Sequence, residues 1–120
     1  MATDEDRKEA LALFDSLVEN RRGGLRELRA QARQATEGGD DDLGRELTLE
    51  ANRLSRARTR IAMARDKVLL TKSLAGPIAE LRRLIGQAED ARARLTRISE
   101  ALDAARRLVD IFRRLVGLFG

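Results

Sequence analysis

Apolar residues recur at alternating intervals of three and four positions through the last third of the chain. This repeat comprises Leu81, Leu84, Ala88, Ala91, Leu95, Ile98, Leu102, Ala105, Val109, Phe112, Val116 and Phe119. A sustained period of 3.5 residues is typical of a helix that packs along a bundle or coiled-coil seam. The pattern therefore predicts a helix over residues 77–119 and favours a fold in which helices pack on helices.

A second helix-forming pattern begins near the N-terminus and predicts a helix over residues 4–36. Thr3 and Asp6 have the spacing of a capping box, with Asp in place of the usual Glu or Gln. Arg21 occupies one of the core positions of this pattern. The pair Gly23–Gly24 lies inside it and costs about 2 kcal/mol of helix propensity relative to alanine. Because the register continues through the pair, we expect one helix with a weak point, and a break there is the alternative.

A third pattern predicts a helix over residues 43–75, preceded by a turn at 37–42. Its apolar positions recur every seven residues at Leu47, Leu54, Ile61, Val68 and Ala75. Gly38 can adopt the left-handed conformation that ends a helix. Pro77 disfavours a helical Gly76 and suits the first turn of a new helix, which predicts a second turn there. The alternative is a kink at Pro77 in one very long helix.

These ranges predict a single all-α domain over residues 1–120. Short connections between helices favour an antiparallel up-down-up three-helix bundle with coiled-coil-like heptad packing. The first two helices would be about 50 Å long and the third about 64 Å, at 1.5 Å per residue. The third helix is therefore expected to be longer than the other two, and residues from about 111 onwards would have no helix beside them.

The uncovered end of this helix is the predicted partner-binding surface. It is strongly apolar, and exposed apolar patches of several hundred Å² on soluble proteins usually mark interaction sites. The residues are Leu108, Ile111, Phe112, Leu115, Val116, Leu118 and Phe119. Coverage of this end by the 37–42 loop or by another helix is the alternative, and in that case no partner is needed.

Arg106, Arg107, Arg113 and Arg114 flank the same apolar residues. A cationic amphipathic helix of this kind also suits the surface of a membrane. Peripheral membrane or lipid-surface binding is therefore a second hypothesis for the end of the chain.

Basic residues concentrate along residues 53–72. Two stripes at seven-residue spacing flank the apolar seam and would form an anion-binding face, comprising Arg53, Arg58, Arg60, Arg65 and Lys72. Nucleic-acid binding by this face is a further hypothesis. Against it, the net charge is only +4 and aromatic residues that could stack on bases are few. Ion pairing of these residues with acids of the neighbouring helices is the simpler interpretation.

The chain contains neither His nor Cys, which excludes the commonest general base, thiol chemistry and the usual transition-metal ligands. Glu46 and Glu50 share a helix face, but carboxylate-bridged metal bundles also require His. Neither the DDD sequence at 40–42 nor the glycine pair matches a calcium or phosphate-binding loop. We therefore expect no enzymatic activity, no metal, no cofactor and no small-molecule substrate.

The function expected from the sequence is a non-enzymatic protein-interaction module of the adaptor, scaffold or chaperone kind. The partner would be another protein or a second copy of the chain, which gives a homo-oligomer. The acidic N-terminus lacks the basic and then apolar pattern of a secretory signal, so the expected location is cytoplasmic.

Overall fold

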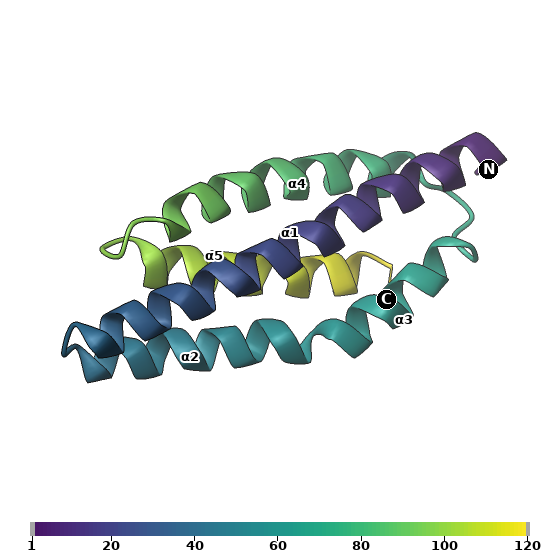
Figure 1. Cartoon of the computed structure of the whole chain (residues 1–120). Coiled ribbons are helices and arrows are strands. Elements are labelled where there is room, and N and C mark those ends of the chain that lie inside the picture. Colours follow the sequence, from purple (N-terminus) through teal and green to yellow (C-terminus); the bar gives the residue numbers. More distant parts are fainter. Residues whose placement is uncertain (1, 120) are drawn as a thin grey trace.

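The computed structural model describes residues 2–119, which form five helices. They are α1 (Asp4–Glu37), α2 (Asp41–Arg56), α3 (Arg58–Val68), α4 (Ala75–Leu95) and α5 (Ala101–Leu118). Only Ala57 separates α2 from α3, and the two helices follow one another along one side of the molecule (Figure 1). The fold is therefore an all-helical up-down-up-down bundle with four members, and the described residues contain no strand.

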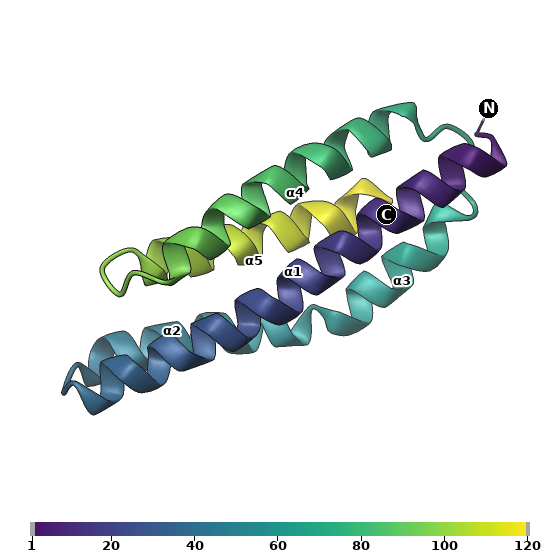
Figure 2. The same cartoon turned by 45° about the horizontal axis from the view of Figure 1, so that its top comes forward.

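The four members form a ring in which α1 and α5 lie diagonally opposite one another. Helix α1 packs between α4 and the α2–α3 pair, and α5 packs on α4, α2 and α3 from the other side. Figure 1 shows α1 between α4 and the α2–α3 pair, and Figure 2 shows α5 beside α4. Since α4 makes no packing contact with α2 or α3, the connection 69–74 crosses the end of the bundle. There the N–H of Ala2 donates a hydrogen bond to the carbonyl of Lys72 at 2.6 Å.

The predicted third helix is wrong in its length, and the three-helix topology is wrong with it. The chain turns at residues 96–100, and α5 runs back along α4 (Figure 2). Thr96, Ile98 and Ser99 have lower helix propensity than the residues around them, but this turn contains neither Gly nor Pro. The reversal places the apolar end of the chain inside the bundle, which removes the length mismatch that a straight helix would create.

The predicted second helix is also interrupted. It ends at Val68 rather than at residue 75, and it breaks at Ala57. At the break, Nη1 of the buried Arg21 donates a hydrogen bond to the carbonyl of Leu54 at 3.2 Å. In a continuous helix this carbonyl would accept from the N–H of residue 58. A side chain that enters the helical hydrogen-bond ladder is a known cause of a helix kink.

Helix α1 has the predicted extent, and its capping box is present. The Thr3 hydroxyl accepts from the Asp6 N–H, and the Asp6 carboxylate accepts from the Thr3 N–H, both at 3.1 Å. The helix continues through Gly23–Gly24. In the following turn, Gly39 (φ 91°) rather than Gly38 has the left-handed conformation.

The glycine pair in α1 allows two neighbours to approach the helix closely. A Cβ atom on Gly24 would lie 2.9 Å from Cδ1 of Leu108 in α5, and one on Gly23 would overlap the guanidinium of Arg92 in α4. Arg92 crosses α1 at this point and donates to Glu27 Oε1 at 2.9 Å and to Asn20 Oδ1 at 3.2 Å. The pair that weakens the helix locally therefore permits its packing against α4 and α5.

Helix α5 packs against all four other helices, as α1 does, and a larger share of its residues is buried than in any other helix. Its buried side chains cover a wide face and comprise Ala101, Ala104, Ala105, Leu108, Val109, Ile111, Phe112 and Leu115. Pro77 lies in the first turn of α4, as expected for a new helix, but the expectation that Gly76 is non-helical is wrong because α4 begins at Ala75. In this first turn the missing N–H of Pro77 leaves no hydrogen bond unmade.

Candidate functional site

The predicted partner-binding surface is largely inside the bundle. Leu108, Ile111, Phe112 and Leu115 are buried, and Val116, Leu118 and Phe119 are partly buried. The prediction that this end is uncovered is therefore wrong. The helix that was expected to extend past its neighbours is two helices, and the second one is covered by the rest of the chain.

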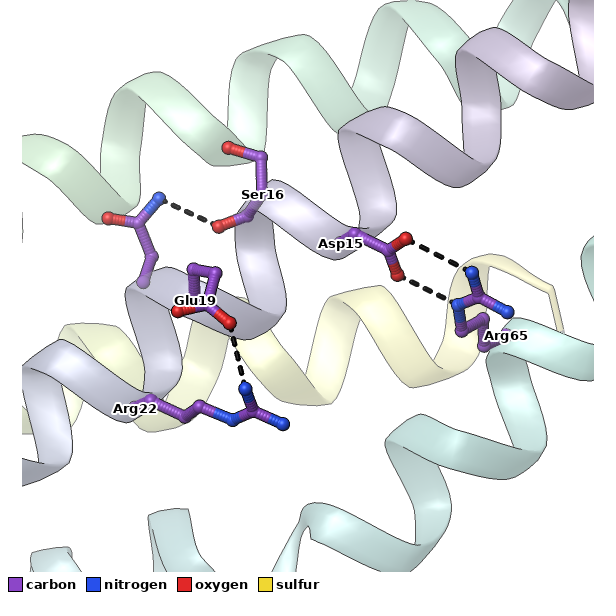
Figure 3. A network of polar contacts seen from close by, with 6 residues as sticks. Asp15, Ser16, Glu19, Arg22 and Arg65 are labelled. Atoms are coloured by element: carbon purple, nitrogen blue, oxygen red, sulfur yellow. Dashed lines mark hydrogen bonds and ion pairs between the residues drawn. The ribbon is translucent and has the colours of Figure 1, made fainter.

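The predicted anion-binding residues separate into groups with different surroundings. Arg65 donates to both carboxylate oxygens of Asp15 in α1, at 2.8 and 3.0 Å (Figure 3). These hydrogen bonds lower the pKa of Asp15 and raise that of Arg65. Lys72 lies in the connection that crosses the end of the bundle, and Arg58 is exposed at the start of α3. Arg65 is thus paired with an acid of a neighbouring helix, as the simpler interpretation of these residues expected.

A groove of about 800 Å³ lies between α1 and α2, on the outside of the bundle. Helix α1 contributes a row of exposed arginines to it, and α2 contributes Thr48, Ala51 and Asn52. Apolar side chains form part of its floor: Ala32 and Ala51 are buried, and Leu25 is partly buried. We call this feature the α1–α2 groove.

Small residues at the helix contact shape the α1–α2 groove. Gly44 lies so close to α1 that a Cβ atom there would overlap the Thr36 hydroxyl and lie 3.4 Å from the Ala32 carbonyl. Close approach at this point and the short side chains of Ala32, Thr48 and Ala51 leave a hollow along the seam. The longer arginine side chains border it.

The basic border of the groove consists of Arg22, Arg26, Arg29 and Arg33. Arg22 donates to Glu19 at 2.8 Å (Figure 3). Within residues 2–119, Arg26, Arg29 and Arg33 form no ion pair. Glu37 is the one acidic residue in the lining and lies at the end nearest the α1–α2 turn. The groove is therefore cationic along most of its length.

This arginine row is not among the sites predicted from the sequence. Intervals of four, three and four residues separate its members, so they share one face of a helix. The spacing of the arginines was visible in the sequence, but the apolar floor of the α1–α2 groove depends on how α2 packs against α1.

A smaller hollow of about 280 Å³ lies where α2 and α3 meet α5. Its basic lining residues are Arg53, Arg56, Arg60 and Arg113, and its apolar ones are Leu54, Ala57, Val109, Phe112 and Val116. Arg53 and Arg60 from the predicted anion-binding set therefore meet Phe112 and Val116 from the predicted partner-binding set. We call this feature the kink pocket.

Arg21 is buried beside the same break in the helix, on the side of α1. Burial lowers the pKa of its guanidinium, with further contributions from the charges of Arg22 and Arg58. Its Nη1 bonds the Leu54 carbonyl, and its Nε has no hydrogen-bond partner in the described residues. The α2–α3 junction is thus surrounded by an excess of positive charge.

Residues 2–119 contain no cluster of three acidic side chains placed to hold a metal ion. None of the helices formed by these residues has the length and apolar character needed to cross a membrane. No family model, curated protein or solved structure matches the chain when it is compared with them.

Proposed function

We propose that this chain is a non-enzymatic protein-interaction module that binds an acidic amphipathic helix of a partner protein in the α1–α2 groove. The observation that carries the proposal is the row Arg22, Arg26, Arg29 and Arg33 beside an apolar floor. The C-terminal residues first expected to bind the partner have no part in it.

The dimensions of the groove suit a short helix. From residue 22 to residue 33 the arginine row spans about 16 Å, or three turns. A helix of similar length could place its apolar residues on Leu25, Ala32 and Ala51 and its carboxylates beside the arginines. Binding of an amphipathic helix in a groove through residues spaced three and four apart is a recurrent mode of recognition.

The charge pattern of the groove favours an acidic occupant. Arg26, Arg29 and Arg33 lack acidic partners within the described residues, so carboxylates of a partner could approach them without displacing an existing ion pair. Such complementarity mainly accelerates association and selects among partners. Arg is also enriched among the residues that dominate binding energy at protein interfaces.

Nucleic acid is the competing occupant of a cationic groove, and two observations favour a peptide. The floor includes apolar side chains that offer nothing to a phosphate backbone, and Glu37 would repel phosphates at one end. The described residues contain three aromatic side chains. Phe14 and Phe112 are buried, and Phe119 is partly buried against Phe14. None of them lines the groove, where it could stack on a base.

A fluorescence anisotropy titration tests the proposal with a labelled, designed amphipathic helix of Glu, Leu and Ala. A peptide of the same composition with scrambled periodicity, and one with Lys in place of Glu, serve as controls. We expect saturable binding of the acidic amphipathic peptide alone. Binding that is equal for the scrambled peptide would show a nonspecific charge effect and overturn the proposal.

Charge reversal locates the binding surface. We expect the double variant Arg26→Glu and Arg33→Glu to weaken peptide binding at least tenfold. The matched control, Lys8→Glu with Arg106→Glu, makes the same net charge change at exposed residues outside the groove and should change the Kd less than twofold. Equal loss in both variants would overturn the groove assignment. Tighter binding of a DNA duplex than of the peptide, abolished by the groove variant, would replace the peptide with nucleic acid.

A further inference from the structure

The kink pocket combines cationic walls with an apolar base. Arg53, Arg56 and Arg60 approach it from α2 and α3, and Arg113 approaches it from α5. The side chains of Val109, Phe112 and Val116 form the α5 side of the base. The adjacent helices α2 and α3 and the distant helix α5 therefore meet around one hollow.

The acidic groups near the pocket do not balance these charges. Among residues 2–119, no carboxylate lines it. Arg53 donates to the buried Glu50 at 2.5 Å, whereas Arg56, Arg60 and Arg113 form no ion pair within residues 2–119. The nearby Arg58 and Arg21 add further positive charge at the same junction. Repulsion among these arginines would be relieved by a bound anion.

From this arrangement we infer that the kink pocket binds a small amphiphilic anion: a carboxylate or phosphate head group attached to a short apolar body. The head group would lie among Arg56, Arg60 and Arg113, since guanidinium groups bind both kinds of oxyanion through paired N–H donors. The apolar body would cover Val109, Phe112 and Val116. This site is separate from the α1–α2 groove, and neither inference depends on the other.

The volume restricts the size of this ligand. At about 280 Å³, the pocket is at the lower limit for small-molecule sites. Only a head group and a short chain would fit, so a long lipid chain would have to extend into solvent. A ligand that bridges α2, α3 and α5 would also hold the two halves of the interrupted helix against α5. Because such a ligand binds the folded state, it should raise the Tm.

Isothermal titration calorimetry and thermal unfolding of the full chain test this inference with hexyl phosphate and hexanoate. Three matched controls each change one property. Hexanol lacks the charge, hexylamine reverses it, and inorganic phosphate lacks the apolar body. We expect saturable binding and a rise in Tm with at least one of the two amphiphilic anions, and at least tenfold weaker binding of all three controls.

The two amphiphilic anions also distinguish the two kinds of head group. Binding of hexyl phosphate alone assigns a phosphate ester, and binding of hexanoate alone assigns a carboxylate. If inorganic phosphate binds as tightly as hexyl phosphate, the pocket binds an adventitious ion only, and the inference is overturned. The absence of saturable binding by either amphiphile would overturn it as well.

Variants connect the binding to the pocket. Arg60→Gln combined with Arg113→Gln should weaken binding of the amphiphilic anion at least tenfold and leave binding of the acidic peptide unchanged. Lys8→Gln combined with Arg106→Gln removes the same charge elsewhere and should retain the anion affinity. Circular dichroism confirms that each variant is folded. A folded Arg60→Gln/Arg113→Gln variant with unchanged anion affinity would overturn the assignment.

Discussion

The ring of Phe119 lies against the ring of Phe14, with 6.0 Å between the ring centroids and 53° between the ring planes. Phe14 is fully buried in α1, and Phe119 directly follows the last residue of α5. A tilted pair at this separation is a favourable arrangement of aromatic rings. The contact links the end of the chain to its first helix and makes the C-terminal segment part of the core.

The first prediction concerns this aromatic pair. We expect Phe119→Ala to lower the free energy of unfolding by about 1–2 kcal/mol, because it removes both partly buried apolar area and the ring contact. Urea denaturation followed by circular dichroism measures the change. Leu70→Ala is the control because its side chain is 82% exposed, and it should change stability by less than about 0.5 kcal/mol. Equal losses of unfolding free energy in the two variants would contradict the packed position of Phe119.

The second prediction compares two helical glycines. Gly86 in α4 has open space where a Cβ would be placed, so Gly86→Ala should stabilise the protein by about 0.5–1 kcal/mol through helix propensity. Gly24→Ala makes the same chemical change but places the methyl group against the fully buried Leu108. We expect a net loss of about 1–2 kcal/mol because the core must shift. Stabilisation by both variants would show that α1 and α5 are not in close contact there.

The third prediction concerns Arg21, which is buried and has no carboxylate partner in the part of the chain that the structure describes. Arg21→Met keeps much of the side-chain volume and removes a charge whose burial is unfavourable, as its lowered pKa indicates. The Leu54 carbonyl loses its side-chain donor but could recover the backbone N–H of residue 58 if the helix becomes continuous. We expect the free energy of unfolding to stay constant or to rise by up to about 1 kcal/mol, as measured by urea denaturation. A loss of more than about 1.5 kcal/mol would show that the hydrogen bond to Leu54 is needed for stability.

The fourth prediction is a pH dependence of the pair Asp15–Arg65. In the folded state, the hydrogen bonds from Arg65 lower the pKa of Asp15, although burial opposes this effect. A carboxyl whose pKa is lower when folded stabilises the protein above its unfolded pKa of about 4. That contribution is lost as the pH falls through the folded pKa.

Because both side chains are substantially exposed, we expect Asp15→Asn to cost only about 0.5 kcal/mol at pH 6. The difference from the unmodified chain should diminish as the pH falls from 6 towards 2, because Asp15 becomes protonated. Urea titrations at the two pH values measure it. A difference that is the same at both pH values would show that the ion pair is not its source.

The helix boundaries that could be predicted are those determined by neighbouring residues. Thr3 and Asp6 are three positions apart, and their reciprocal hydrogen bonds start α1 where the sequence indicated. The turn at 96–100 could not be predicted in this way. It lacks Gly and Pro, and Ile98 and Leu102 continue the apolar register through it, although Ile98 is 37% exposed. Local pattern alone therefore favours one helix where packing produces two.

The two candidate sites were only partly readable from the sequence. Arg53 and Arg60 were identified for their charge, and Phe112 and Val116 for their apolar character, but about sixty residues of chain separate the two groups. Only the return of α5 along α2 and α3 places them around one pocket. The row of arginines in α1 had a recognisable spacing, but its significance depends on Ala51 in a different helix.

The sequence by itself determined that the chain is helical, where its first helix begins and ends, and that its apolar C-terminal segment requires cover. These properties depend on helix propensity, capping and periodicity, which act over about four residues. The tertiary structure decided that the cover comes from the same chain. That outcome depends on how much apolar surface α5 buries against four other helices at once, relative to the cost of forming the turn at 96–100. A sum over contacts between residues far apart in sequence cannot be predicted from any short stretch of the chain.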